Sequence, residues 1–307
     1  MVYDLIIIGA GPAGMTAAIY AARKKLKTLM LTKDIGGQTA MSSDIENYPG
    51  FTMITGAELV KKFEEHLEEF KDDVELRLTN NGVGGIKKEE KGFTVSMPGG
   101  SEEKAKAIII TGGKIARKLN VEGEQEFLNR GVSYCAWCDG PLFANKEVAI
   151  VGGGNSALDA AINLAKLVKQ AYIINISSSL EGDPIMIEKV KTLANVRIIN
   201  NANLKKINGS KFVEAIEITD KESGLDKEIK IAGVFIEIGS VPASDYLIDL
   251  IKLNEQGEII IDEHNMTSEP GIFAAGDITD TIEKQIIVAA GEGAKAAIQA
   301  SQYLSRR

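Results

Sequence analysis

The chain has 307 residues, of which 44% are hydrophobic and 25% are charged, and its formal net charge is −8. This length suits two domains of ordinary size, and the acidic balance argues against a general nucleic-acid binder. No run of eighteen apolar residues occurs, so we expect no membrane-spanning helix. The sequence enters an apolar run directly after Met1 without a signal-peptide pattern, so a cytoplasmic location is expected.

Residues 2–33 contain a strand, turn, helix and strand pattern. Residues 2–8 are an apolar run typical of a buried parallel strand, residues 15–23 predict a helix, and residues 28–31 predict a second strand. The turn at 9–14, GAGPAG, indicates a dinucleotide site, because its glycines let the backbone approach a pyrophosphate at a helix N-terminus. The alternative is a tight turn without a ligand, and Leu31-Thr32-Lys33 lacks the usual carboxylate for a ribose hydroxyl.

The segment from 36 to 111 carries less specific signals. Turn-rich loops occupy 36–38 and 46–50, and an apolar stripe at 59, 63, 67 and 70 predicts a helix that packs on the core. Residues 74–78, 93–97 and 107–111 predict three strands, which we expect to form an antiparallel ribbon.

Two cysteines, Cys135 and Cys138, are the only ones in the sequence, and Asp139 follows directly. A zinc site is disfavoured because only His66 and His264 could complete it, so no metal is predicted. A structural disulfide is weak, because closing so short a loop removes only about 2 kcal/mol of unfolded-state entropy. A redox dithiol is favoured, in which one thiol reacts and the other resolves the mixed disulfide.

The pattern of the first unit returns from residue 146. Residues 146–151 predict a strand, the turn at 152–157 reads GGGNSA, and residues 158–168 predict an amphipathic helix. A shift of 143 positions aligns Gly9 with Gly152 and Gly11 with Gly154. This internal repeat predicts two facing nucleotides, one able to reduce the other; a second unit kept only as a scaffold is the alternative.

The last third begins with GIFAAGD at 271–277, which predicts a strand that leads into Asp277. Gln285 then opens a small-residue helix that runs to about Tyr303. Its alanines and glycines predict close packing against a flat neighbour, and tight helix–sheet packing is the plainer interpretation.

Together these motifs resemble the low-molecular-weight thioredoxin reductases and their near relatives, including the C-terminal part of the alkyl hydroperoxide reductase flavoprotein. The similarity rests on GAGPAG, ENYPG, TGG at 111–113, YCAWCDG, GGGNSA and GIFAAGD, in the same order and spacing. It implies an α/β fold of two doubly wound, three-layer dinucleotide-binding domains, the second inserted into the first. We expect an FAD-binding domain at 1–115 and 243–307, an NAD(P)-binding-like domain at 116–242, and hinges near 114–117 and 239–243.

The resemblance also implies roles for individual residues. Cys138 resembles the thiol that faces the flavin, Cys135 the interchange thiol that attacks a partner disulfide, and Asp139 the acid/base. Trp137 is bulkier than the residue expected between the cysteines. FAD would be bound by Gly9, Gly11, Pro12, Ala13, Gly14, Gly37, Gln38, Asn47, Thr111, Gly112, Gly276, Asp277, Lys284, Gln285 and Ile286. A nicotinamide dinucleotide would be bound by Gly152, Gly154, Asn155 and Ser156.

The electron donor is where the sequence departs from the NADPH-dependent members of the family. Those members place a His-Arg-Arg run after the second strand of the inserted domain, and guanidinium groups suit the 2′-phosphate. Here the strand at 172–176 is followed by Ser177-Ser178-Ser179, and the next arginine is Arg197. NADPH is therefore disfavoured and NADH favoured, with ferredoxin or a deazaflavin as the alternative donor.

The expected function is reduction of a thioredoxin-like or glutaredoxin-like protein by a homodimeric flavoenzyme. A ferredoxin–nicotinamide reductase of the same fold is a rival, although such relatives need no C-x-x-C. A rival of another class is a non-catalytic flavin-bound redox sensor, which would bind FAD but turn over no disulfide substrate.

Overall fold

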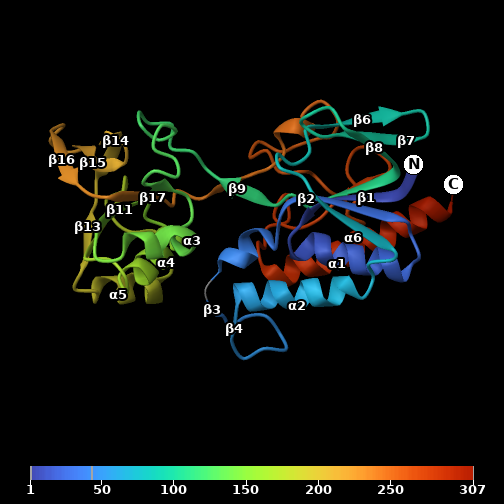
Figure 1. The fold of residues 1–307 in the computed structure, drawn as a ribbon, viewed down its shortest axis with the longest axis horizontal. Coiled ribbons are helices and arrows are strands. Elements are labelled where there is room, and N and C mark those ends of the chain that lie inside the picture. Colours follow the sequence, from blue (N-terminus) through green and yellow to red (C-terminus); the bar gives the residue numbers. More distant parts are fainter. Residues whose placement is uncertain (1, 43, 307) are drawn as a thin grey trace. The chain divides into compact units, whose positions relative to one another are not determined.

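Two compact units make up the chain, which the computed structural model describes for residues 2–42 and 44–306. Unit 1 comprises Met1–Ile115 and Val241–Arg307, and unit 2 comprises Ala116–Ser240. In Figure 1 the blue to cyan and the red segments belong to unit 1, and unit 2 runs from green through yellow to light orange. Unit 1 is thus built from both ends of the chain, and unit 2 is inserted between them.

The framework of unit 1 is a mixed seven-stranded sheet with the order β5-β2-β1-β8-β7-β6, in which β19 also pairs with β8. Strands β5, β2, β1, β8 and β19 are mutually parallel. Strand β7 pairs antiparallel with β6 on one side and with the first half of β8 on the other. The bounds are β1 (Val2–Ala10), β2 (Thr28–Ile35), β5 (Val74–Leu78), β6 (Gly85–Glu89), β7 (Gly92–Ser96), β8 (Glu102–Ile110) and β19 (Ile272–Ala274).

The predicted antiparallel ribbon is correct for one strand pair and wrong for the rest. Only the segment at 93–96 pairs antiparallel, with residues 102–105. Residues 74–78 form β5, which runs parallel to β2, and residues 107–110 run parallel to β1. The physical reason is the connection: helix α2 (Gly56–Glu68) separates β2 from β5, and a helical crossover joins parallel strands.

Both faces of the unit 1 sheet are buried, which explains the unbroken apolar run in β1. Leu5 and Ile7 face helices α1 (Pro12–Arg23), α2 and α6 (Ile286–Ser305). Ile6 and Ile8 face the opposite side, where β7 and the segment around Leu247 pack. Successive side chains point to opposite faces, so a strand covered on both sides must be apolar at every position.

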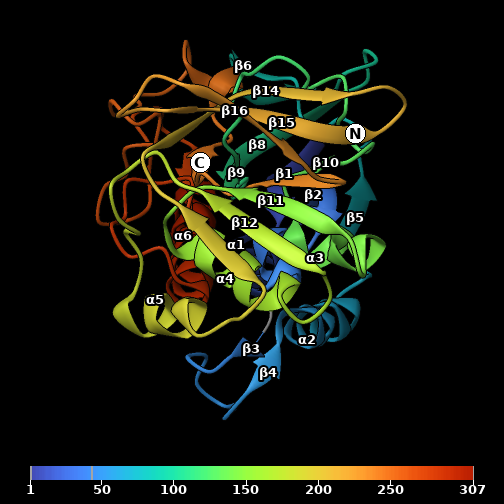
Figure 2. The ribbon, with the colours of Figure 1, turned by 90° about the vertical axis from the view of Figure 1, so that its left-hand side faces the viewer.

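Unit 2 has a five-stranded parallel sheet with the order β10-β17-β11-β12-β13. Helices α4 and α5 cover one face, and a three-stranded antiparallel sheet, β14-β15-β16, covers the other. Figure 2 shows these layers. The bounds are β10 (Val132–Ser133), β11 (Glu147–Val151), α4 (Asn155–Leu164), β12 (Gln170–Ile174), α5 (Pro184–Lys191), β13 (Val196–Ile199), β14 (Ala202–Gly209), β15 (Val213–Asp220), β16 (Asp226–Lys230) and β17 (Gly233–Ile236).

The predicted α/β fold is confirmed, with shifts at the element ends. Helix α1 begins at Pro12 rather than residue 15, because proline suits the first helical position. Helix α4 covers 155–164 rather than 158–168, and β12 ends at Ile174 rather than residue 176. Both glycine turns therefore lead directly into their helices.

Short elements complete the chain. They are 3₁₀ helix η1 (Gly37–Met41), β3 (Asp44–Ile45), β4 (Ile54–Thr55), β9 (Lys114–Ala116), α3 (Ala136–Asp139), 3₁₀ helix η2 (Gly140–Phe143), β18 (Ser240–Pro242) and 3₁₀ helix η3 (Asp245–Leu247). Strands β9 and β18, which connect the two units, pair with each other. Gly113 and Gly239 precede them with φ angles of 61° and 88°, a region that glycine adopts without strain.

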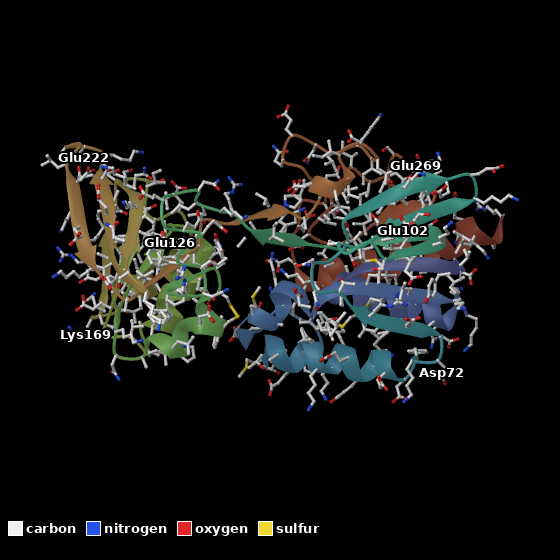
Figure 3. All side chains as sticks on the ribbon, turned by 45° about the horizontal axis from the view of Figure 1, so that its top comes forward. Asp72, Glu102, Glu126, Lys169, Glu222 and Glu269 are labelled. Carbon is white, nitrogen blue, oxygen red and sulfur yellow. A yellow bond between two sulfur atoms is a disulfide. The ribbon has the colours of Figure 1, made fainter. Side chains whose placement is uncertain are left out.

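The excess of acidic over basic residues lies almost entirely in unit 1, although both units carry exposed carboxylates. Asp72 and Glu102 of unit 1 are exposed, as are Glu126 and Glu222 of unit 2 (Figure 3). Within residues 2–42 and 44–306, no helix is long and apolar enough to cross a bilayer.

The small residues of α6 are explained by close packing on another helix. A Cβ added at Gly293 would lie 2.0 Å from the carbonyl oxygen of Ala13 in α1. The flat neighbour expected from the sequence is therefore, at this position, the first turn of α1. In contrast, a Cβ at Gly291, two residues earlier on α6, meets no atom within 4 Å.

We predict that Gly293→Ala lowers the free energy of unfolding by about 1–3 kcal/mol, because the added methyl group overpacks the α1–α6 contact. The matched control is Gly291→Ala, which should be neutral or stabilising by about 0.5–1 kcal/mol, since alanine favours a helix over glycine. Urea denaturation of both variants measures the difference. Equal stability of the two variants would contradict the packing argument.

Candidate functional site

The first glycine turn lies where two neighbouring parallel strands end. Gly9 has φ +111°, and a Cβ there would come within 2.4 Å of the carbonyl oxygen of Thr111. The Thr111 hydroxyl donates to the carbonyl oxygens of Ile8 (2.9 Å) and Gly9 (3.0 Å). Since β2 and β8 lie on opposite sides of β1, this edge is a topological switch point, where open α/β sheets bind ligands.

Gly11 leaves room for a ligand at the start of α1. It is the extended N-cap of the helix, and the nearest atom to an added Cβ is the Gly36 carbonyl oxygen at 4.0 Å. In the described first turn of α1, no side chain caps the helix and no acidic residue is present. An uncapped helix N-terminus approached by bare backbone fits the pyrophosphate of FAD.

Other residues predicted to contact the flavin are brought together in unit 1 from distant parts of the sequence. The Asn47 side-chain amide donates to Gln285 Oε1 at 3.1 Å, and the Gln38 amide donates to the Lys114 carbonyl oxygen at 2.7 Å. Lys284 forms an ion pair with Glu258 at 3.1 Å. Gln285 is also the N-cap of α6, whose first residue is Ile286.

Asp277 stands in a turn that a buried carboxylate holds in place. Glu292 of α6 accepts a hydrogen bond from the backbone N–H of Gly276 at 2.7 Å and another from the hydroxyl of Thr281. Burial raises the pKa of Asp277 above its usual range, and the positive charges of Lys284 and Lys114 oppose this shift. Sequence reasoning missed Glu292; its signal was a single acid on the small-residue face of a helix.

The cysteines follow β10 and form a disulfide, with Cα atoms 5.4 Å apart (Figure 3). The backbone N–H of Cys135 donates to Ser133 Oγ at 2.9 Å, and the N–H of Cys138 donates to Cys135 Sγ at 3.1 Å. Cys138 is exposed and Cys135 is half-buried. Asp139 ends α3, and Trp137 is 42% exposed.

A second buried carboxylate anchors the residue that precedes the dithiol. Glu124 accepts a hydrogen bond from the Tyr134 hydroxyl at 2.5 Å and another from the Leu119 N–H at 2.8 Å. Burial, and then the bond to Glu124, raises the pKa of Tyr134. Nothing in the sequence indicated this pair, because its residues lie ten positions apart in irregular segments.

Within unit 2, the dithiol and the second glycine turn share one edge of the sheet, with Glu237 between them. Cys135 follows β10, Glu237 follows β17 and Gly152 follows β11, and these three parallel strands are neighbours. A Cβ added at Gly152 would lie 2.2 Å from the Glu237 carbonyl oxygen. The backbone N–H of Ala136 lies close enough to the Glu237 carboxyl to lower its pKa. Sequence reasoning missed this residue because strand order cannot be read from the chain.

The second turn repeats the backbone of the first. Gly152 has φ +137°, and Gly154, like Gly11, is an extended N-cap with no atom within 4 Å of an added Cβ. Asn155 opens α4, and its Oδ1 accepts the N–H of Asp183 at 2.7 Å. Ser156 is the second residue of that helix. The turn thus keeps the form that a pyrophosphate needs.

The side chain of Asn175, which directly follows β12, forms its hydrogen bonds within its own loop and with the neighbouring strand end. It is buried, and its amide donates to the Ser179 carbonyl oxygen at 2.8 Å and to Asn200 Oδ1 at 2.9 Å. A cation does approach this loop: Lys221 Nζ donates to the Ile176 carbonyl oxygen at 3.2 Å. Lys221 escaped the sequence-based prediction because it lies 45 residues further along the chain.

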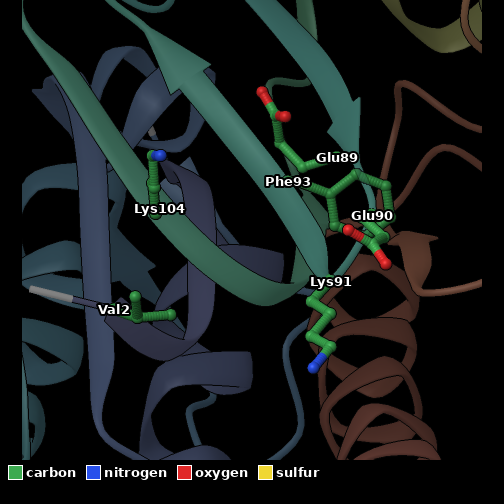
Figure 4. A pocket seen from close by; sticks show the side chains of 6 residues that line it. All are labelled: Val2, Glu89, Glu90, Lys91, Phe93 and Lys104. Carbon is green, nitrogen blue, oxygen red and sulfur yellow. The ribbon is translucent and has the colours of Figure 1, made fainter.

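A hollow elsewhere in unit 1 carries none of the predicted residues. It lies at the amino end of β1 and beside the β6–β7 turn, at the opposite end of β1 from Gly9 (Figure 4). Its lining residues are Val2, Glu89, Glu90, Lys91, Phe93 and Lys104. Among residues 2–42 and 44–306, no group of three or more His, Cys, Asp or Glu side chains could hold a metal ion.

Comparison with known proteins gives consistent matches. The family model described as "Pyridine nucleotide-disulphide oxidoreductase" matches residues 3–293. The chain is 40% identical over 304 residues to an NADH dehydrogenase of Bacillus subtilis and, equally, to a component of the alkyl hydroperoxide reductase of Staphylococcus aureus. These alignments cover 99% of this chain but 59% of each relative.

Solved structures match over their whole length. Thioredoxin reductase of Lactococcus lactis in the "FR conformation" has a TM-score of 0.91 and 37% identity, and covers 99% of this chain and 100% of its own. Thioredoxin reductase of T. acidophilum has a TM-score of 0.88 and 38% identity, with 98% of both chains covered.

The environment of Glu237 predicts a pH-dependent stability. Burial raises its pKa from the ordinary value of 4.5 to about 7; the Ala136 N–H opposes this shift and the charge of Asp159 adds to it. Between these values the unfolded chain releases a proton that the folded chain keeps, so stability falls as the pH rises through this window.

We therefore expect Glu237→Gln to match the wild type near pH 4.5 and to be more stable above pH 7, by up to about 3 kcal/mol. Urea denaturation at both pH values measures this difference. The same difference in unfolding free energy between variant and wild type at both pH values would contradict the raised pKa of Glu237.

Proposed function

Because the chain belongs to the pyridine nucleotide-disulphide oxidoreductase family and matches thioredoxin reductases over its whole length, we propose that it reduces a thioredoxin-like protein through Cys135 and Cys138. The observation that carries this proposal is the disulfide itself, which lies on the same sheet edge as an intact dinucleotide turn. A dithiol beside a nucleotide site suits electron transfer better than stapling, since so short a loop stabilises the fold little.

FAD, when bound, supplies two-electron transfer between a nicotinamide and the dithiol. The chain's own residues would hold it: Gly9, Gly11 and Gly14 at the pyrophosphate, with the N-terminus of α1 facing its charge. Asp277, fixed through Glu292, would accept a ribitol hydroxyl. Asn47 and Gln285, already joined by a hydrogen bond, would line the ring, with Ile286 at its pyrimidine edge.

The transfer to the partner is a thiol–disulfide exchange. The Cys135 thiolate attacks one sulfur of the partner disulfide, which forms a mixed disulfide and releases the first partner thiolate. The Cys138 thiolate then attacks Cys135 Sγ, which releases the second partner thiolate and restores the Cys135–Cys138 bond. Asp139 would take up and return the thiol protons. The dithiol loses two electrons and two protons, and the partner gains them.

The dithiol must face the flavin in one step and the partner in the next, which one fixed arrangement cannot provide. We propose that unit 2 rotates about the β9–β18 ribbon. The support for this hinge is local: two strands form the connection, and Gly113 and Gly239 next to them tolerate large changes in φ and ψ.

The family implies a nicotinamide cofactor, and we propose NADH as the donor. The loop after β12 offers serines rather than arginines, so a 2′-phosphate would lack guanidinium partners. Lys221 is the cation that opposes this assignment, but Glu222 follows it and would partly offset its charge. The buried Asn175 would shape the loop rather than bind the ribose.

We predict that Cys135→Ser abolishes reduction of a thioredoxin-like partner, because the attacking thiol is lost, and leaves flavin reduction by the donor intact. Cys138→Ser is the matched variant: it should still form the mixed disulfide but fail to resolve it. Partner thiols are measured with a chromogenic disulfide, and the trapped mixed disulfide by mass spectrometry. Full partner turnover by Cys135→Ser would refute these roles.

We expect NADH to bleach the bound flavin with a second-order rate constant at least about tenfold above that of NADPH, since the 2′-phosphate adds charge without guanidinium contacts. Anaerobic stopped-flow absorbance measures both rates. Lys221→Gln should slow the NADPH reaction further and leave the NADH reaction unchanged. Faster reaction with NADPH, or no reaction with either, would contradict NADH as the donor.

A further inference from the structure

Glu237 is the carboxylic acid at the centre of the functional edge of unit 2. Its strand, β17, lies between β10, which leads to the cysteines, and β11, which leads to the second glycine turn. The Glu237 N–H donates to the Val151 carbonyl oxygen at 2.8 Å, which continues the ladder past the end of β17. The position of the residue is therefore fixed by the sheet.

The side chain of Glu237 reaches the dithiol turn. Phe235 is the register partner of Ser133, so Glu237 lies level with Cys135 on the neighbouring strand. The N–H of Ala136, which belongs to the peptide that joins Cys135 to Ala136, lies close enough to the Glu237 carboxyl to lower its pKa. The preceding peptide of Cys135 is held from the other side, because the Cys135 N–H donates to Ser133 Oγ at 2.9 Å. Cys135 thus lies between a neutral hydroxyl and a titratable carboxyl.

The charge on this carboxyl bears on the chemistry of the neighbouring sulfur. Reduction of the disulfide adds two electrons and two protons and breaks the S–S bond, and the Cys135 thiol must then lose its proton to attack a partner. A negative charge next to the thiol opposes that loss, whereas a neutral carboxylic acid does not.

Other groups around Glu237 also affect the charge state of its carboxyl group. Asp159 of α4 adds negative charge, the Ala136 N–H of α3 adds a donor, and the backbone of the Gly152 turn packs against the Glu237 carbonyl oxygen. Asp139 stands at the end of α3. Burial keeps the pKa of Glu237 at about 7, so the group changes charge in the range in which thiols ionise.

We propose that Glu237 is a positioning residue that makes the reactivity of Cys135 depend on the protonation state of its own carboxyl group. Protonated Glu237 holds the Cys135–Ala136 peptide without opposing the thiolate. Ionised Glu237 holds the same peptide and disfavours the thiolate, so the two groups titrate as a coupled pair. This proposal rests on the proposed function, in which Cys135 is the attacking thiol.

The test is the pH profile of thiol alkylation in the full-length protein. The protein is reduced with dithiothreitol, freed of reductant without oxygen, and alkylated with iodoacetamide between about pH 5 and pH 10, with Cys135 and Cys138 read separately by mass spectrometry. The Glu237→Gln variant keeps the shape and a hydrogen-bond acceptor but has no charge. The control is Glu147→Gln at the amino end of β11, where the carboxylate pairs with Lys169 at 2.8 Å.

Near pH 5 we expect Cys135 to be alkylated at the same rate in Glu237→Gln and in the wild type. At higher pH the alkylation profile of Glu237→Gln should be shifted by about one pH unit toward lower pH, so that alkylation near neutral pH is roughly threefold to tenfold faster. Glu147→Gln should follow the wild type throughout. Superimposed profiles for Glu237→Gln and wild type, or a uniform change at every pH, would overturn the proposal.

The wild-type protein provides a second test of the proposal, which needs no variant. Its Cys135 profile should rise more gradually than a single titration, since two coupled groups ionise together; a single-site curve would overturn the proposal even if Glu237→Gln failed to fold. The experiment needs no flavin, donor or partner protein. Failure of the proposed function would appear as partner turnover by Cys135→Ser, which is a separate result.

Discussion

Parallel strand pairing is the constraint on which the rest of the structure depends, because it gathers the carboxyl ends of strands at one edge of each sheet. In unit 1 it places Gly9 and Thr111 side by side, close enough that no side chain fits at Gly9. In unit 2 it places the dithiol, Glu237 and the second glycine turn after three neighbouring strands. The dithiol turn, Glu237 and the second glycine turn are thus brought together by this register rather than by proximity in the chain.

Buried carboxylates fix the loops that this edge leaves irregular. Glu292 holds the backbone at Gly276, next to the proposed ribitol contact, and Glu124 holds Tyr134, next to Cys135. Backbone N–H groups that bond to a carboxylate form stronger hydrogen bonds than neutral pairs do, so a few such residues can order long loops. Glu237 also lies near a backbone N–H of such a loop but carries a raised pKa, on which the proposed pH response of the dithiol turn depends.

Features that depend on local backbone requirements could be predicted from the sequence. The two glycine turns were recognisable because Gly9 and Gly152 occupy conformations and spaces that exclude a side chain, and Gly11 and Gly154 leave their helix starts open. The strand order, the parallel pairing of β5 and the contacts of Glu292, Glu237 and Lys221 could not be predicted. Each depends on residues that are distant in sequence, and a single glutamate or lysine in a helix, strand end or turn looks like any solvated charge.

The proposed mechanism depends on two electron acceptors working in one chain, the flavin and the Cys135–Cys138 disulfide. The most direct measurement is an anaerobic reductive titration of the FAD-loaded protein that counts the electrons taken up per flavin and the thiols formed. The mechanism predicts uptake of four electrons, two by the flavin and two by the disulfide, with both thiols appearing. Uptake of only two electrons, with the disulfide intact, would contradict it.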